Sequence, residues 1–147
     1  MSKDLYKSRK MYQNPVVLII AVVCVMILAI FVIDIVSKKV SIAKIDNDTK
    51  TVLKDIMEVE SEKRKEVAEE EFKKLGNNSP NINIIENGNT LVLINNSSYF
   101  TIVGELFKKP KYYTASFKAS YNDYHEIVVE KYDDGVNDSK NDDIIIK

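Results

Sequence analysis

The chain has 147 residues, of which 21 are Lys or Arg and 22 are Asp or Glu, so its formal net charge is −1. A nearly neutral chain whose larger, C-terminal part is mildly acidic lacks the basic surface that nucleic-acid-binding proteins use to attract phosphates, so we expect no nucleic-acid partner. The single cysteine, Cys24, excludes an intrachain disulfide and a cysteine-based metal site.

We expect residues 1–15 to form a short basic tail and residues 16–36 to form a transmembrane helix. Residues 16–33 form a run of 18 without a charged or strongly polar side chain. As a helix this run would be roughly 27 Å long, close to the thickness of the hydrocarbon core of a bilayer. It is too long for a core strand, and no A-x-A-like site follows it as in a cleaved signal peptide. The residues expected to form the membrane anchor are Val16, Ile20, Val23, Ile27, Ile30 and Ile33.

Positive charges flank this apolar run on both sides. They are Lys3, Lys7, Arg9 and Lys10 before it, and Lys38, Lys39 and Lys44 soon after it. The slight excess before the run favours a cytoplasmic N-terminus, with the C-terminal part outside the cell membrane. Asp34 is expected to lie at the membrane interface, where it marks the end of the span.

We expect residues 37–76 to form an amphipathic helical stalk that continues from the membrane helix. Apolar residues recur at helical spacing in two groups, Val52, Ile56 and Val59, then Ala68, Phe72 and Leu75. Asp46 or Asp48 is expected to cap a second helical segment after a kink, and Gly76 to follow the last helical turn. A strict coiled coil, which needs more sustained heptads, is the lesser alternative.

After Pro80 the alternation changes to a period of two, which predicts a small β-rich head over residues 80–132. The expected strands cover residues 81–86, 90–95, 112–121 and 126–132, with a glycine turn between the first two. Residues 95–98 predict another turn, and the apolar residues 99–107 either a strand or a short helix. Residues 133–147 predict an acidic polar tail, with 144–146 as a short edge strand or a trailing end.

The expected fold class is therefore α+β, with a single transmembrane helix continuing into an amphipathic helical stalk and then a small antiparallel β-sheet head. No residues have the spacing of a catalytic, cofactor or metal site, so we expect a protein that is not an enzyme. His125, the only histidine, is expected in a solvated turn, and the acidic residues near the C-terminus do not match an EF-hand. The candidate interaction surface is Tyr112, Tyr113, Tyr121 and Tyr124, with ordinary sheet packing as the alternative.

Three segments have the order of an alternating strand at 90–94 (TLVLI), an apolar loop at 99–107 (YFTIVGELF) and a small-residue strand at 113–119 (YTASFKA). Together with the membrane helix, this order resembles the TadE-like minor pilins of tight-adherence (Tad) pilus systems. The resemblance implies a membrane helix that runs into a stalk and a small outer head. Pilin-like families are cleaved after a Gly, with a Glu early in the apolar run. Here Asn14 and Pro15 begin the run and no Glu lies in it, which implies an uncleaved or atypical member.

We therefore expect a noncatalytic, membrane-anchored structural or assembly subunit of a bacterial envelope apparatus, pilin-like and of the Tad type. Its expected partners are the lipid bilayer and other membrane or pilus-assembly subunits, including further copies of itself, with no small-molecule substrate. A bitopic scaffold subunit of a conjugation or type IV secretion channel would have the same layout and is the alternative. A small extracytoplasmic ligand sensor is a third possibility.

Overall fold

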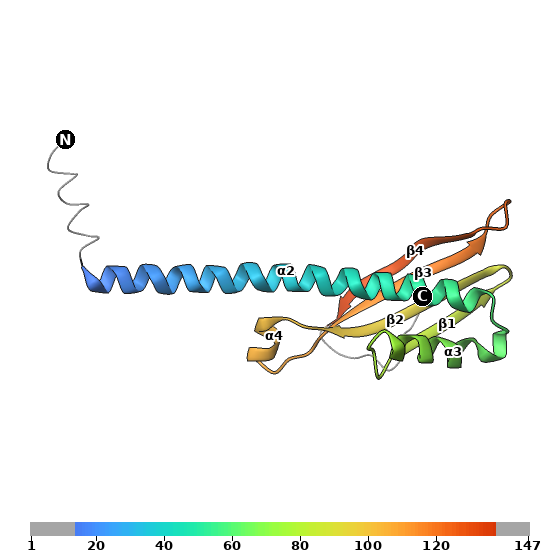
Figure 1. Cartoon of the computed structure of the whole chain (residues 1–147), viewed down its shortest axis with the longest axis horizontal. Helices are drawn as coiled ribbons and strands as arrows, with labels where there is room; N and C mark the ends of the chain where they lie inside the picture. Colours follow the sequence, from blue (N-terminus) through green and yellow to red (C-terminus); the bar gives the residue numbers. More distant parts are fainter. Residues whose placement is uncertain (1–13, 138–147) are drawn as a thin grey trace. The chain divides into compact units, whose positions relative to one another are not determined.

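The computed structural model describes the backbone of residues 14–137 and the side chains of residues 14–132. Along the chain the elements are α2 (Pro15–Met57), α3 (Ser61–Lys74), β1 (Asn81–Asn87), β2 (Thr90–Tyr99), α4 (Ile102–Leu106), β3 (Lys111–Tyr121) and β4 (Ile127–Asn137) (Figure 1). The fold class is α+β, as expected: a long, N-terminal apolar helix precedes a small antiparallel sheet. The chain divides after Val36 into two units, of which we call the second, Ser37–Lys147, the head.

Helix α2 begins where the sequence offers a capping residue followed by proline. The side-chain oxygen of Asn14 accepts a hydrogen bond of 3.0 Å from the backbone N–H of Val16, and the backbone oxygen of Asn14 accepts one from Leu18. Asn14 is therefore the N-cap and Pro15 the first helical residue, where the missing N–H of proline has no cost.

The kink predicted at Asp46 or Asp48 is wrong, because α2 continues without interruption to Met57. Neither aspartate caps a helix. Asp46 accepts a hydrogen bond of 3.0 Å from the hydroxyl of Tyr113, and Asp48 forms an ion pair with Lys44, one helical turn earlier. Both carboxylates thus have partners that an aspartate inside a helix can reach, which removes their competition for backbone N–H groups.

Helix α3 ends at the glycine that the sequence predicts. Gly76 has a φ of +95°, a conformation that glycine adopts without steric cost. The N–H of Gly76 donates to the carbonyl of Lys73, and the N–H of Asn77 donates to that of Phe72. These two bonds are those of a Schellman motif, which satisfies the last carbonyl groups of a helix.

The four strands form one antiparallel sheet in the order β1-β2-β3-β4. Gly88 and Asn89 form the two-residue turn between β1 and β2, since Asn87 pairs with Thr90. The turn predicted at 95–98 is wrong, because β2 continues to Tyr99 and pairs with β3 over its whole length. The following apolar stretch contains the short helix α4.

Strand β4 is longer than the sequence pattern indicates. Residues 133–137, expected in the polar tail, continue the strand and pair with residues 112–116 of β3, after a bulge opposite Ser116 and Phe117. Because β3 offers a long row of backbone partners, the strand extends beyond its apolar residues. The remaining residues of the predicted tail, including 144–146, lie outside the described residues, as do residues 1–13 of the predicted basic tail.

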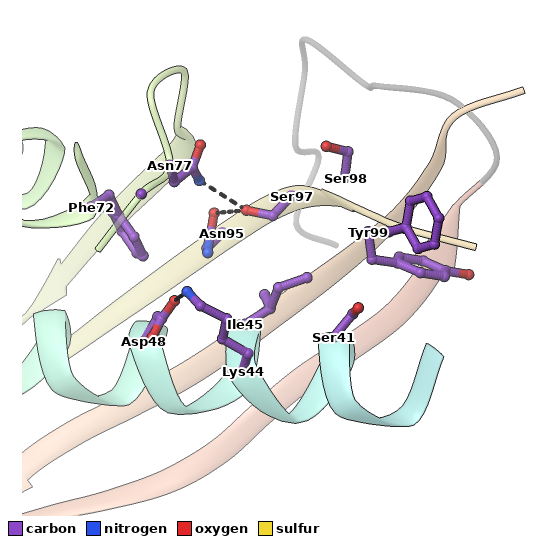
Figure 2. A pocket seen from close by; sticks show the side chains of 12 residues that line it. Ser41, Lys44, Ile45, Asp48, Phe72, Asn77, Asn95, Ser97, Ser98 and Tyr99 are labelled. Atoms are coloured by element: carbon purple, nitrogen blue, oxygen red, sulfur yellow. Dashed lines mark hydrogen bonds and ion pairs between the residues drawn. The ribbon is translucent and has the colours of Figure 1, made fainter. Parts of the chain in front are cut away.

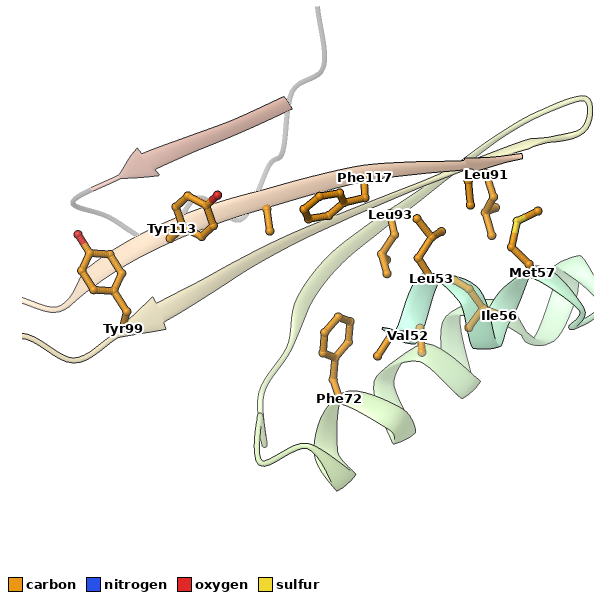
Figure 3. Close-up of a cluster of buried hydrophobic side chains, with 13 residues drawn as sticks. Val52, Leu53, Ile56, Met57, Phe72, Leu91, Leu93, Tyr99, Tyr113 and Phe117 are labelled. Carbon is orange, nitrogen blue, oxygen red and sulfur yellow. The ribbon is translucent and has the colours of Figure 1, made fainter. Parts of the chain in front are cut away.

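The core of the head lies between one face of the sheet and the helical residues that the sequence predicts as a stalk. From the helices, Leu53, Ile56 and Phe72 are buried to 0–1 % exposure, against Leu93 and Phe117 of the sheet (Figure 3). The apolar residues that recur at helical spacing therefore do form buried helix faces, and these faces pack on the sheet. The last turns of α2 and helix α3 thus contribute to the core of the head.

Candidate functional site

The apolar first part of α2 is the clearest functional feature of the described residues. It belongs to the single helix there that is long and apolar enough to cross a membrane. The side chains expected to form the anchor are all well exposed: Val16, Ile20, Val23, Ile27, Ile30 and Ile33 have 42–59 % of their surface accessible. A helix that is apolar on all sides and uncovered by its own chain is suited to a lipid environment, where its backbone is satisfied internally.

The four tyrosines of the candidate interaction surface do not form one patch. Tyr112 and Tyr121 stand at opposite ends of β3, about 30 Å apart at the rise of an extended strand. Tyr113 points into the core, is 4 % exposed and binds Asp46. Tyr124, at 84 %, is the most exposed and lies in the turn before β4. Only Tyr121 and Tyr124 are both exposed and close in sequence.

A chain of hydrogen bonds between polar side chains crosses the head from α2 to the loop after α3. The amide of Asn95 donates to the hydroxyl of Thr49 over 3.0 Å, and that hydroxyl donates to the carbonyl of Ile45 over 2.7 Å. Ser97 donates to the side-chain oxygen of Asn95, and the amide of Asn77 donates to Ser97. Thr49 and Asn95 are at most 1 % exposed, so this network is part of the core.

Three residues of this network, Asn77, Asn95 and Ser97, line a pocket of about 250 Å³ (Figure 2). Lys44 lies at the pocket and pairs with Asp48, while its ammonium also donates to the carbonyl of Leu75 over 3.2 Å. Tyr99, the last residue of β2, and Phe100 after it also line the pocket. The pocket is smaller than the usual range of about 300–1,000 Å³ for small-molecule sites, and its charged groups already satisfy one another.

A second polar cluster connects the start of α3 to the end of β1. The hydroxyl of Ser61 lies 2.8–2.9 Å from both carboxylate oxygens of Glu86, and Arg64 forms an ion pair of 2.9 Å with the same carboxylate. The hydrogen bond from Ser61, and then that from Arg64, lower the pKa of Glu86 below its ordinary value of 4.5. Arg64 also donates to the carbonyl of Ile56, so the cluster helps to close the turn between α2 and α3.

The other residues singled out in the sequence have structural positions. His125 is exposed in the turn before β4, with a φ of +62°, as expected of a solvated turn histidine. Asn122 organises that turn, since its side-chain oxygen accepts hydrogen bonds from the N–H groups of Tyr124 and Glu126. Within residues 14–132, no three His, Cys, Asp or Glu side chains are grouped so that they could hold a metal ion.

Sequence reasoning missed the buried network, although one signal for it is present. Counting in steps of two from Leu91 and Leu93 places Asn95 and Ser97 on the core face of β2. Thr49 likewise lies at helical spacing before Val52, Leu53 and Ile56. The polarity of these residues indicated a turn, whereas their periodicity indicated a buried strand.

The segment after β2 exposes apolar side chains that its sequence pattern does not indicate. Leu106 and Phe107 are 73 % and 69 % exposed, which makes them the most exposed large apolar side chains of the described part of the head apart from Tyr124. Phe100, a few residues earlier, is 55 % exposed.

Comparison of the chain with family models, with curated proteins and with solved structures gave no match in any of the three.

Proposed function

We propose that this protein is a noncatalytic, membrane-anchored structural or assembly subunit of a bacterial envelope apparatus, pilin-like and of the Tad pilus type. The observation that carries the proposal is the exposed apolar first part of α2, and the chain continues from it into a head with a core of its own. Such a chain is held in a bilayer by one element and presents the other to partners. The order of helix, alternating strand, apolar loop and small-residue strand supports the pilin-like assignment.

In this proposal the apolar helix has two roles. It anchors the chain in the cell membrane, with the N-terminus in the cytoplasm and the head outside. It also packs laterally against membrane helices of other subunits, including further copies of this chain, because exposed small side chains such as Ala21 allow close approach. The helix is then an assembly element as well as an anchor.

Replacing residues 16–33 of the full chain with an all-leucine run of equal length separates these two roles. The leucine helix keeps the chain in the membrane but removes the side-chain pattern needed for specific packing. We expect the variant to remain membrane-bound and to lose incorporation into high-mass envelope complexes, measured by native electrophoresis and by shearing of surface filaments in the native host. Unchanged incorporation of the leucine variant would contradict an assembly role of the span.

The pocket beside the buried network favours a second candidate, a sensor of a small extracytoplasmic ligand. Its lining includes the ammonium of Lys44, the carboxylate of Asp48 and the polar side chains of β2. A ligand that binds the folded head there would raise its melting temperature, and the rise would grow with the logarithm of the ligand concentration above the dissociation constant. A screen of polar metabolites against the purified chain, with Lys44→Met as the control, distinguishes this function from a purely structural one.

A further inference from the structure

The loop between β2 and β3 exposes apolar side chains that a soluble surface would normally avoid in such close succession. Leu106 and Phe107 are adjacent and about 70 % exposed, and Phe100 precedes the same short helix. Two lysines, Lys108 and Lys109, follow directly. We call residues 100–109 the α4 loop.

The α4 loop is a tightly hydrogen-bonded turn that holds these side chains outward. The hydroxyl of Thr101 accepts a hydrogen bond of 2.8 Å from the N–H of Gly104, which caps α4. After the helix, Lys108 adopts a φ of +52°, and the N–H groups of Lys108 and Lys109 donate to the carbonyls of Glu105 and Gly104. The backbone therefore turns sharply after Phe107, and the apolar pair forms the tip of the loop.

Gly104 lies in a closely packed part of the loop. A Cβ atom added to Gly104 would lie 2.5 Å from the hydroxyl of Thr101 and 3.0 Å from the carbonyl oxygen of Lys109. Gly104 is buried, whereas Leu106 and Phe107 are not. The exposed apolar tip is thus a consequence of the fold of the loop.

The α4 loop lies near the residues with which the head begins. The head begins at Ser37, and Ser41, about one turn further on, lines the same pocket as Tyr99 and Phe100. Figure 1 shows α4 beyond the paired ends of β2 and β3, and Figure 2 shows Ser41 and Tyr99 at the same pocket. The first residues of the head along α2 are therefore neighbours of this loop.

We propose that the α4 loop is a second membrane contact, in which Leu106 and Phe107 enter the interface of the bilayer and Lys108 and Lys109 bind anionic lipid headgroups. Exposed apolar side chains followed by lysines are the chemistry of interfacial binding. Lys108 and Lys109 outnumber the one acidic residue of the loop, the exposed Glu105, so the net positive charge of the loop complements an anionic lipid surface. This inference rests on the proposed function, because it requires that residues 16–33 span the bilayer. The contact would fix the tilt of the head on the membrane surface.

The chain contains no tryptophan, so a single introduced tryptophan reports on its own environment. Phe107→Trp places the reporter at the tip, and Tyr124→Trp, at a position 84 % exposed in another turn of the head, is the matched control. The full chain is reconstituted in vesicles of phosphatidylglycerol and phosphatidylcholine, with brominated acyl chains as the quencher. We expect the Phe107→Trp variant to emit further to the blue than the Tyr124→Trp variant and to be quenched several-fold more strongly.

Charge dependence and the membrane anchor are tested separately. Lys108→Glu with Lys109→Glu in the Phe107→Trp background, or vesicles of phosphatidylcholine alone, are expected to remove most of the difference in quenching. Equal emission and quenching of the two tryptophan variants would overturn the proposal. A Phe107→Trp variant that is shielded from iodide but not quenched by brominated lipid would also overturn it, because that result indicates a protein contact. Failure of the chain to float with the vesicles would instead contradict the membrane anchor.

Discussion

Among single residues, Thr49 and Asn95 join helix α2 to the sheet through buried side chains. One hydrogen bond of 3.0 Å joins helix α2 to the inner strand β2, at a site where both side chains are closed to water. A buried polar pair of this kind stabilises little overall, but it is satisfied in only one register of the helix on the sheet. The pair therefore specifies how α2 packs as much as how strongly it packs.

Thr49→Val keeps the shape of the side chain and removes its hydroxyl. The amide of Asn95 then loses its acceptor in a site almost closed to water, so we expect a loss of about 1–3 kcal/mol in the free energy of unfolding. Urea unfolding of the full chain in detergent, followed by the near-ultraviolet circular dichroism of its tyrosines, measures the change.

Thr51→Val is the matched control. Like the hydroxyl of Thr49, the hydroxyl of Thr51 donates to the carbonyl four residues earlier, which is that of Asn47 at 2.9 Å, but Thr51 lies on the exposed side of α2. We expect this variant to change the free energy by no more than about 0.5 kcal/mol. Equal losses in the two variants would mean that the bond between Thr49 and Asn95 does not contribute to stability.

Glu86 makes the stability of the head depend on pH in the acid range. Because its pKa is lower in the folded chain than its ordinary value of 4.5, the carboxylate contributes stability above that value, and the contribution is lost as the pH falls through the folded pKa. Ser61→Ala removes the largest cause of the shift. We expect the pKa of Glu86, followed by nuclear magnetic resonance, to rise toward 4.5 in this variant, and an unchanged value would contradict the assignment to Ser61.

At the scale of elements, the two helical segments and the sheet depend on each other. Helix α3 has 14 residues, a length that is marginal for an isolated helix in water, and only Ala68 and Phe72 of it are fully buried. Phe72 therefore carries most of the burial that fixes α3 against the sheet.

Phe72→Ala is expected to cost about 3–5 kcal/mol in the free energy of unfolding, through lost burial and the cavity that remains. The control is Leu75→Ala, at the C-cap of the same helix and 36 % exposed, for which we expect a smaller loss. Hydrogen exchange of the amides of α3 checks the mechanism, because their protection should fall more than that of β2 and β3. Uniform loss of protection over the head would show instead that α3 is not a separately stabilised element.

The elements themselves could largely be predicted from the sequence, whereas several of their ends could not. Periodicity predicts the helices, Gly76 predicts the end of α3, and alternation with Gly88 predicts the first hairpin. The end of β2 was misplaced because Asn, Asn, Ser and Ser favour turns locally, while backbone pairing to β3 and the polar network hold them in the strand. Local preference was overruled by contacts with residues far along the chain.

The sequence places the break between the two helices too early, at Asp46 or Asp48, because contacts in the folded chain again overrule a local preference. Asp46 and Asp48 carry a capping signal, but their partners are Tyr113 and Lys44. The candidate surface of four tyrosines likewise depended on which face of β3 each occupies, and Tyr113 and Tyr112 differ because successive strand residues face opposite sides. The pocket and the α4 loop required the tertiary arrangement and had no distinct sequence pattern.

For the whole molecule, one apolar helix and one small folded head are joined in a single chain. The head buries its own apolar residues, whereas residues 16–33 bury almost none of theirs, so the second set requires a different environment. In our proposal a bilayer supplies that environment, and the same lipid surface receives Leu106 and Phe107 of the α4 loop. The proposed anchoring, lateral assembly and second membrane contact all depend on these exposed apolar side chains.

The most direct test is whether the full-length chain stays in the membrane after extraction at alkaline pH. We expect all of it in the membrane pellet, and we expect release of a variant with Val23→Lys and Ile27→Lys, because each charge near the centre of the bilayer costs about 2.5–3.5 kcal/mol. Extraction of the unaltered chain into the supernatant, or recovery of a shortened soluble chain that begins after residue 33, would contradict a membrane-anchored subunit.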